Sequence, residues 1–220
     1  MQKKHKPNIA DFYKAVLFPL IFVLIIWAVK LVEVIFDISF VEFGIYPQSL
    51  SGLKGILLSP LIHGDYKHLI SNTIPVIVLG SMLCYFYKEI WLKVISIGWI
   101  TLGFWLWVIG RESFHIGASG LIYFLAAFLF VSGILRKHTS LMAVSLIVTF
   151  LYGSIIWGIF PLEERMSWEG HLSGLVAGIL LAFFFRNEGP QRAKYQWEIE
   201  EEFDLDEDDE YWKTNIEENI

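Results

Sequence analysis

Long apolar segments separated by short polar connections dominate this chain. Six of them are almost purely apolar: residues 16–29, 68–87, 91–110, 119–135, 141–160 and 171–185. Several fall a little short of the ~20 residues needed to cross a bilayer core. Because such segments would aggregate in water, the pattern predicts an all-α membrane protein, a bundle of six transmembrane helices.

The connection between the first two segments, residues 37–67, is long and mixed. Glycine and proline interrupt it too often for a spanning helix, yet apolar clusters such as Ile56–Leu58 suit the membrane interface. Loops of this length are often functional. Two of the six segments also contain helix breakers, Pro75 in the second and Gly153 and Gly158 in the fifth.

Lysines precede the first segment, as in a signal peptide, but no small-residue cleavage site follows it. Lys30 and Glu33 lie near its far end, and the apolar character resumes at Val34. We therefore expect a first helix that stays in the membrane. The single cysteine, Cys84, lies within an apolar segment and is expected to face lipid or pack in the core.

Composition agrees with a membrane protein, since 55% of the residues are hydrophobic and the mean hydropathy is +0.53. The net charge of −6 comes from the C-terminal tail, which holds more than half of the 23 acidic residues. No basic aromatic patch indicates a nucleic-acid partner. The predicted organisation is a cytoplasmic segment (residues 1–15), a six-helix domain (16–186) and a disordered acidic tail (187–220).

Basic residues flank the segments unequally. With a cytoplasmic N-terminus, the larger group lies inside: Lys3, Lys4, Lys6, Lys14, Lys88, Lys93, Arg136, Lys137, Arg186, Arg192 and Lys194. The outer connections hold Lys54, Lys67, Arg111 and Arg165. Because cytoplasmic connections carry the excess of Lys and Arg, both termini are predicted to be cytoplasmic. The size and the minimal six-span core suggest a bacterial inner membrane.

This orientation places the N-terminal ends of the second, fourth and sixth segments at the outer face. Those ends carry His68 and Asn72, Ser119, and His171. Polar side chains at membrane depth usually face the interior of the bundle and serve function. The Ser119 hydroxyl is a weak nucleophile unless a base lies beside it. The histidines at this depth are His63, His68, His115 and His171.

Small residues would allow Ser119 and His171 to meet. Gly174 and Gly178 form a ridge on the helix that His171 opens, and such ridges let a neighbouring helix approach closely. Gly117 and Gly120 are expected to make the helix thinner around Ser119 in the same way. The imidazole and the hydroxyl could then come within hydrogen-bond reach.

The same face offers partners for the rest of a hydrolytic site. Tyr123, one turn below Ser119, could stack on the imidazole. An oxyanion needs preorganised donors, and the start of the Ser119 helix has free backbone N–H groups. His68 and Asn72 are four residues apart, hence on one helix face, and both carry N–H donors.

Each element also has a purely structural interpretation. The small residues around Ser119 could serve helix packing alone, and His171 could be an interfacial histidine. His68 with Asn72 could form a helix cap and a buried polar bridge. Glu169 could tune His171, although a surface carboxylate is the simpler expectation.

The chain shows no pattern of a metal site. His63, His68 and Asp65 have no cysteine beside them, and their spacing fits no common zinc pattern. We expect no metal and no cofactor.

In combination, these motifs resemble the rhomboid intramembrane serine proteases. The resemblance covers roughly residues 16–186 and rests on these stretches: Gly117-Ala118-Ser119-Gly120 with Tyr123, His68-x3-Asn72, Gly170-His171-x2-Gly174-x3-Gly178, Gly44-Ile45-Tyr46-Pro47 and His63-Gly64-x3-His68. It implies a six-helix rhomboid bundle whose first loop lies partly in the membrane. It also implies that transmembrane segments of other membrane proteins are the substrates.

The resemblance assigns roles to the site residues. Ser119 would be the nucleophile and His171 the general base of a dyad without an acidic third member. Tyr123 would pack under His171, and Gly120 and Gly174 would support the site.

Two further expectations follow from the resemblance. Asn72, His68, Gly117 and the backbone N–H of Ser119 would stabilise the oxyanion. Residues 163–169 would cap the site, with Met166 and Trp168 as its gate.

One stretch departs from the family pattern, because the Trp-Arg pair of many relatives is absent near Lys54-Gly55. The competing function is a catalytically silent rhomboid-like adaptor that binds transmembrane clients. Inactive relatives typically lose the serine or the histidine, whereas both are present here. A small-molecule transporter is disfavoured, because no inverted repeat or pair of broken helices is visible.

Overall fold

The computed structural model describes residues 9–161 and 166–192. Within these residues the protein is all-helical, with seven α-helices, short 3₁₀ helices and one isolated β-bridge between Ile45 and His115. The predicted all-α membrane-protein class is thereby confirmed. The predicted disordered tail lies almost wholly outside the described residues, as does most of the predicted N-terminal segment.

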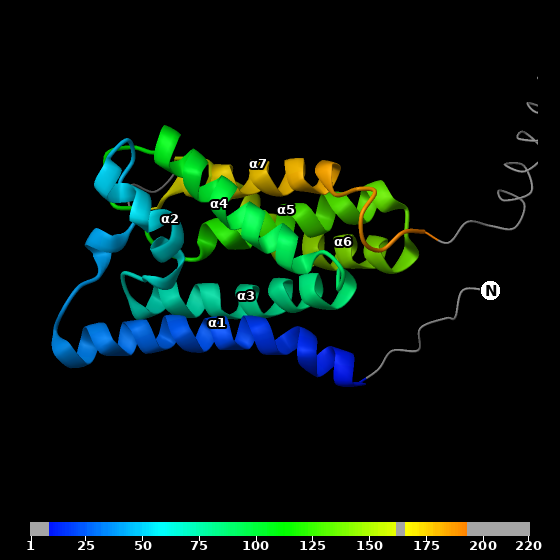
Figure 1. The fold of residues 1–220 in the computed structure, drawn as a ribbon, viewed down its shortest axis with the longest axis horizontal. Coiled ribbons are helices and arrows are strands. Elements are labelled where there is room, and N and C mark those ends of the chain that lie inside the picture. The colour runs from blue at the N-terminus through cyan, green and yellow to red at the C-terminus, as the bar shows by residue number, and fades with distance from the viewer. Residues whose placement is uncertain (1–8, 162–165, 193–220) are drawn as a thin grey trace, which may run out of the picture.

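Four helices are long and apolar enough to cross a membrane: α1 (Ile9–Phe36), α3 (Tyr66–Phe86), α4 (Trp91–Ile109) and α5 (Ser119–Arg136). They coincide with the first four apolar segments of the sequence. The other two segments form the shorter apolar helices α6 (Thr139–Tyr152) and α7 (Trp168–Phe184). By length, four of the six predicted spans therefore qualify. Apart from α4, which runs obliquely, these helices run roughly along the long axis of the molecule (Figure 1).

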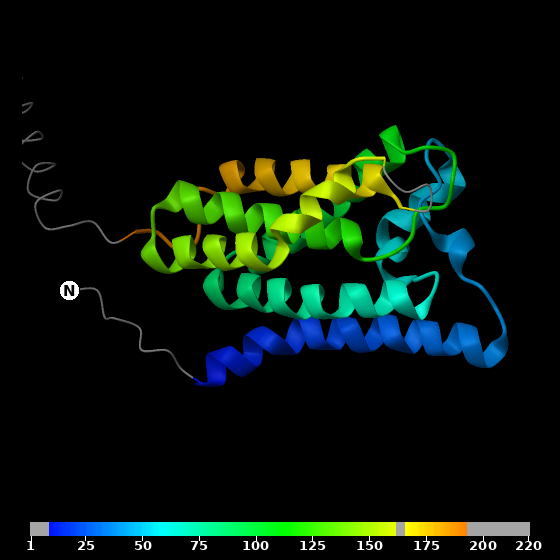
Figure 2. The same ribbon diagram turned by 180° about the vertical axis from the view of Figure 1, so that it is seen from behind.

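The fifth segment is short as an α-helix because it changes helix type. α6 ends at Tyr152, and the 3₁₀ helix η4 (Gly153–Ile159) begins at the first of the two glycines. A 3₁₀ helix rises about 2.0 Å per residue, against about 1.5 Å for an α-helix. η4 thus carries the chain from α6 towards the end of the bundle where α7 begins (Figure 2).

The loop after α1 is folded rather than irregular. It contains η1 (Val41–Phe43), η2 (Leu50–Lys54), α2 (Gly55–Leu58) and η3 (Ser59–Leu61). Two indoles of α4 hold it, since Trp99 donates to the Ile56 carbonyl and Trp107 to the Ser49 carbonyl, both at 2.8 Å. This loop therefore forms a fixed wall at one end of the bundle.

α5 lies within the bundle and packs closely against α7. A Cβ on Gly174 would overlap the carbonyl oxygen of Gly120, and one on Gly178 would overlap that of Phe124. The two backbones are thus in direct contact, as the small-residue ridge predicts. This contact sets how far apart the first turns of the two helices can lie.

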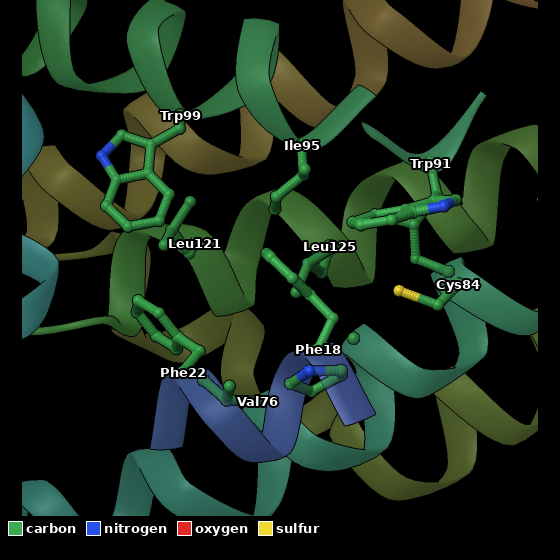
Figure 3. Close-up of a pocket in the computed structure, with 12 residues that line it drawn as sticks. Phe18, Phe22, Val76, Cys84, Trp91, Ile95, Trp99, Leu121 and Leu125 are labelled. Atoms are coloured by element: carbon green, nitrogen blue, oxygen red, sulfur yellow. The ribbon is translucent and has the colours of Figure 1, made fainter. Parts of the chain in front are cut away.

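α1 packs along α3 at the edge of the bundle (Figure 1). It also reaches α4 through ring contacts of Phe18 with Trp91 and of Phe22 with Trp99, with centroids 4.9 and 5.6 Å apart. A small apolar cavity lies among these rings (Figure 3). Cys84 is buried and lines this cavity from α3, in agreement with a packing role.

Candidate active site

An open cavity of about 610 Å³ lies where α3, α5 and α7 begin. Its polar lining comes from these three helices and from the residues that precede each of them: Asp65, His68, Ser71, Asn72, Arg111, Ser113, His115, Ser119, Ser167 and His171. The three polar helix openings seen in the sequence therefore meet in one place.

Ser119 and His171 are in contact in this cavity. Ser119 is the first residue of α5, and His171 lies in the first turn of α7. The Ser119 Oγ is 2.9 Å from the His171 Nε2. The imidazole is buried and the hydroxyl is half-buried. A hydroxyl within hydrogen-bond reach of an imidazole nitrogen is the arrangement that activates an alcohol as a nucleophile.

The other ring nitrogen of His171 fixes the tautomer. Nδ1 lies 2.8 Å from the carbonyl oxygen of Gly158 in η4. A carbonyl oxygen can only accept, so Nδ1 carries the proton and donates it. In the neutral ring Nε2 is then the acceptor, and it is free to take the hydroxyl proton of Ser119.

Tyr123 supports the imidazole from below. The rings of Tyr123 and His171 lie 4.2 Å apart between centroids, with only 8° between their planes. Gly158 closes this stack, because a Cβ there would run into the Tyr123 hydroxyl and lie 3.2 Å from the His171 Nδ1. The imidazole is thus held on one face by a ring and at Nδ1 by a carbonyl.

The opposite wall of the cavity holds hydrogen-bond donors. Asn72 is 4% exposed, and its side-chain Nδ2 has no hydrogen-bond partner among the described residues. His68 lines the same wall one turn earlier on α3. Buried donors are nearly always satisfied, so an unpaired amide facing a cavity indicates a group prepared for a ligand atom.

Gly117 shapes the approach to Ser119 rather than offering its own N–H. That N–H already donates to the Ser59 carbonyl at 2.8 Å. Its φ of +105° lies in a region that L side chains rarely adopt. A Cβ at this position would also run into the His68 ring. Gly117 therefore allows His68 to lie against the backbone that leads into α5.

His63 lies behind this wall and is almost fully buried. Its Nε2 accepts the Ala118 N–H at 3.4 Å, and its ring is 5.0 Å from the His68 ring. Burial, and secondarily the neighbouring His68, lowers the pKa of His63 to about 4. The neutral ring that can accept the Ala118 N–H is therefore the stable form at neutral pH.

His115 ties the loop before α5 to the start of α7. Its Nε2 lies 3.1 Å from the Arg111 carbonyl, and its Nδ1 lies 2.6 Å from the Ser167 hydroxyl. Ser167 in turn accepts the Gly170 N–H and caps α7. His115 thus fixes the helix that carries His171 and does not itself contact Ser119 by a hydrogen bond.

The expectation that Glu169 is a surface carboxylate is wrong. Its side chain is 3% exposed, and Oε1 lies 3.7 Å from the Nε of Arg111. Because Arg111 belongs to the loop before α5, this ion pair is a second link between that loop and the start of α7. Buried charged side chains in proteins are usually paired in this way.

The predicted cap is described only in part, because residues 162–165 lie outside the described residues. Met166 lines the cavity, and its carbonyl accepts a hydrogen bond from Arg111 at 2.7 Å. Trp168 is half-buried at the start of α7 and does not line the cavity.

Sequence reasoning missed two backbone groups that contact His171 and Gly117. Both are carbonyl groups, of Gly158 and of Ser59. Because every residue has a backbone carbonyl, the residue type does not indicate which ones form these contacts. The only signal in the sequence is indirect, since Gly158 is a helix breaker near the end of its segment.

The chain is similar to one known family and to several known proteins. Residues 51–188 match the Rhomboid domain family. An uncharacterized protein of Mycobacterium tuberculosis and one of Mycobacterium bovis are each 35% identical over 182 residues, covering 79% of this chain and 75% of the relative. An uncharacterized protein of Mycobacterium leprae is 33% identical over 183 residues, covering 79% of this chain and 71% of the length of the relative.

Proposed function

The chain belongs to the rhomboid family, and from that premise we propose that it is an intramembrane serine protease. Its substrates are transmembrane segments of other membrane proteins, and Ser119 and His171 form its catalytic dyad. The observation that carries the proposal is the 2.9 Å contact between the Ser119 Oγ and the His171 Nε2, with Nδ1 held by a carbonyl.

The reaction follows from these positions. The Ser119 Oγ attacks the scissile carbonyl carbon while Nε2 of His171 takes the hydroxyl proton. The protonated imidazole then gives this proton to the leaving amine as the peptide C–N bond breaks. Water, deprotonated by the same nitrogen, hydrolyses the acyl-enzyme and restores Ser119. The Gly158 carbonyl and the Tyr123 ring keep the imidazole in place throughout.

The oxyanion that forms during each step needs donors already in position. The Asn72 side chain supplies one, since its Nδ2 is buried at the cavity wall and unpaired among the described residues. The Ser119 N–H is in the first turn of α5, where backbone N–H groups have no partner within the helix. His68 completes this wall, and Gly117 lets its ring approach.

The site lies at one end of the bundle and opens outward, which suits a reaction that consumes water. We place this end at the outer face of a bacterial inner membrane, with both termini in the cytoplasm. The distribution of basic residues supports this orientation. A substrate helix must unwind locally at this depth, because its peptide bonds are otherwise shielded by their own hydrogen bonds.

Labelling with a serine-directed fluorophosphonate probe tests the proposal without a known substrate. The purified protein is expected to be labelled, Ser119→Ala not at all, and His171→Ala far more slowly. Ser71→Ala is the matched control, because Ser71 lines the same cavity without contacting His171, and it should be labelled like the wild type. A folded wild type that resists labelling would instead favour a silent adaptor.

A further inference from the structure

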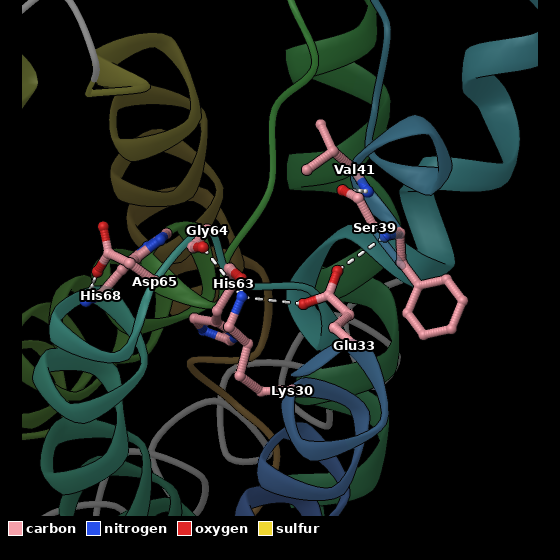
Figure 4. Close-up of polar contacts among 9 residues, drawn as sticks. Lys30, Glu33, Ser39, Val41, His63, Gly64, Asp65 and His68 are labelled. Carbon is pink, nitrogen blue, oxygen red and sulfur yellow. Dashed lines mark hydrogen bonds and ion pairs between the residues drawn. The ribbon is translucent and has the colours of Figure 1, made fainter. Parts of the chain in front are cut away.

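Two charged residues near the end of α1, the half-buried Lys30 and the buried Glu33, lie against the loop that leads into α3. The side chains of Lys30 and Glu33 are 13% and 5% exposed, and the Nζ of Lys30 lies 3.1 Å from Oε2 of Glu33. The same Nζ donates to the carbonyl oxygens of His63 at 3.1 Å and of Gly64 at 3.0 Å. Its three donors thus meet three acceptors (Figure 4).

Glu33 also holds the beginning of this loop. Its Oε1 accepts the backbone N–H of Phe40 at 2.7 Å. One part-buried ion pair therefore binds both the segment that leaves α1 and the segment that enters α3 (Figure 4). An apolar pair could pack there as well, but it would offer no donor to the two carbonyl oxygens.

The segment that Lys30 holds leads directly into the first turns of α3. These turns carry His68 and Asn72, the hydrogen-bond donors that form one wall of the cavity (the donor wall). His63 contacts the Ala118 N–H next to Ser119, and its ring lies against that of His68. Asp65 caps α3, because its Oδ1 accepts the His68 N–H at 2.7 Å. The position of the first turns of α3 relative to Ser119 is therefore set from residues 63–65.

We propose that the Lys30–Glu33 pair is a positioning element for catalysis, which holds His68 and Asn72 at the correct place opposite Ser119. Neither residue lines the cavity, so both act through the loop and the first turns of α3. The inference rests on the proposed function, because positioning is measurable only in a site that turns over substrate.

Lys30→Met removes the ammonium and keeps the length of the side chain. We expect kcat for cleavage of a transmembrane substrate to fall by about 10²-fold with KM nearly unchanged, as for a small misplacement of reacting groups. Lys30→Arg restores a cation and should recover part of the loss. Lys88→Met is the control, because Lys88 pairs with Asp11 at 3.0 Å and joins α1 to the opposite end of α3. Its kcat should match the wild type.

A double-mutant cycle separates positioning from general weakening. If Lys30 acts through the donor wall, its effect on kcat should shrink to less than half, on a logarithmic scale, when Asn72 is already alanine. Full additivity, or a Lys30→Met enzyme with wild-type kcat, would overturn the inference. If Lys30→Met does not fold, Glu33→Gln, which removes the charge that pairs with Lys30, takes its place in the cycle under the same criteria. A wild type without any cleavage would contradict the proposed function instead.

Discussion

The backbone carbonyl of Gly158 accepts a hydrogen bond from Nδ1 of His171 at 2.8 Å, so a residue without a side chain orients the candidate base. In many serine hydrolases a carboxylate does this work. Here a neutral acceptor fixes the same tautomer without placing another charge at membrane depth, where charge is costly.

Gly158→Ala should therefore impair the dyad. The new Cβ would collide with the Tyr123 hydroxyl and lie 3.2 Å from the His171 Nδ1. We expect kcat to fall by about 10²-fold, since a small displacement of the imidazole is sufficient for such a loss. Gly153→Ala is the control in the same 3₁₀ helix, because its Cβ would meet only a Thr149 methyl at 3.8 Å. Equal kcat values for the two variants would show that the Gly158 position is not critical.

Asn72→Ala removes the unpaired donor from the cavity wall. Loss of one oxyanion donor typically lowers kcat by about 10²–10³-fold. The reaction should be slowed and not abolished, because the Ser119 N–H and His68 remain. Steady-state kinetics with one substrate checks this, with Ser71→Ala, on the neighbouring position of α3, expected to keep its kcat. A change confined to KM would argue against a role for Asn72 in the transition state.

Gly174→Ala should separate α5 from α7. Its Cβ would overlap the Gly120 carbonyl, and overpacking of this kind costs about 1–3 kcal/mol. We expect a lower thermal midpoint in detergent and slower fluorophosphonate labelling, because Ser119 and His171 move apart. Val176→Ala, at a partly exposed position of the same helix, should change neither quantity appreciably. A Gly174→Ala protein as stable and as reactive as the wild type contradicts the close-contact interpretation.

His63 should make stability depend on pH. Its pKa is about 4 in the folded protein and about 6.5 when unfolded, so the unfolded chain binds more protons between these values. Its contribution is therefore complete above pH 6.5 and is lost as the pH falls towards 4, by roughly 3 kcal/mol at most. Thermal unfolding of the wild type and of His63→Gln between pH 4 and pH 7 measures it. The wild type should lose more stability on acidification, and parallel curves would refute this role.

Periodicity and charge were enough to predict the helices that carry the site. His68, Ser119 and His171 each open an apolar segment, and counting the flanking basic residues placed all three at one end. The glycines of α5 and α7 then predicted a close contact between these two helices. Each of these inferences uses side chains that the membrane environment strongly constrains.

The contacts that sequence could not predict involve backbone atoms or distant charges. No pattern of residues specifies that η4 brings the Gly158 carbonyl to His171. Glu169 was expected at the surface because its partner, Arg111, belongs to another loop. In the sequence Lys30 and Glu33 are visible only as charges near the end of a helix, since their partners His63, Gly64 and Phe40 contribute backbone groups.

Cleavage of a transmembrane substrate by the purified protein tests the dyad most directly. Wild type, Ser119→Ala and His171→Ala should be compared in the same bilayer, after each has been shown to be folded. We predict that the wild type releases two fragments and that both variants release none above the background rate. Equal cleavage by the wild type and Ser119→Ala would contradict the assignment of Ser119 as the nucleophile.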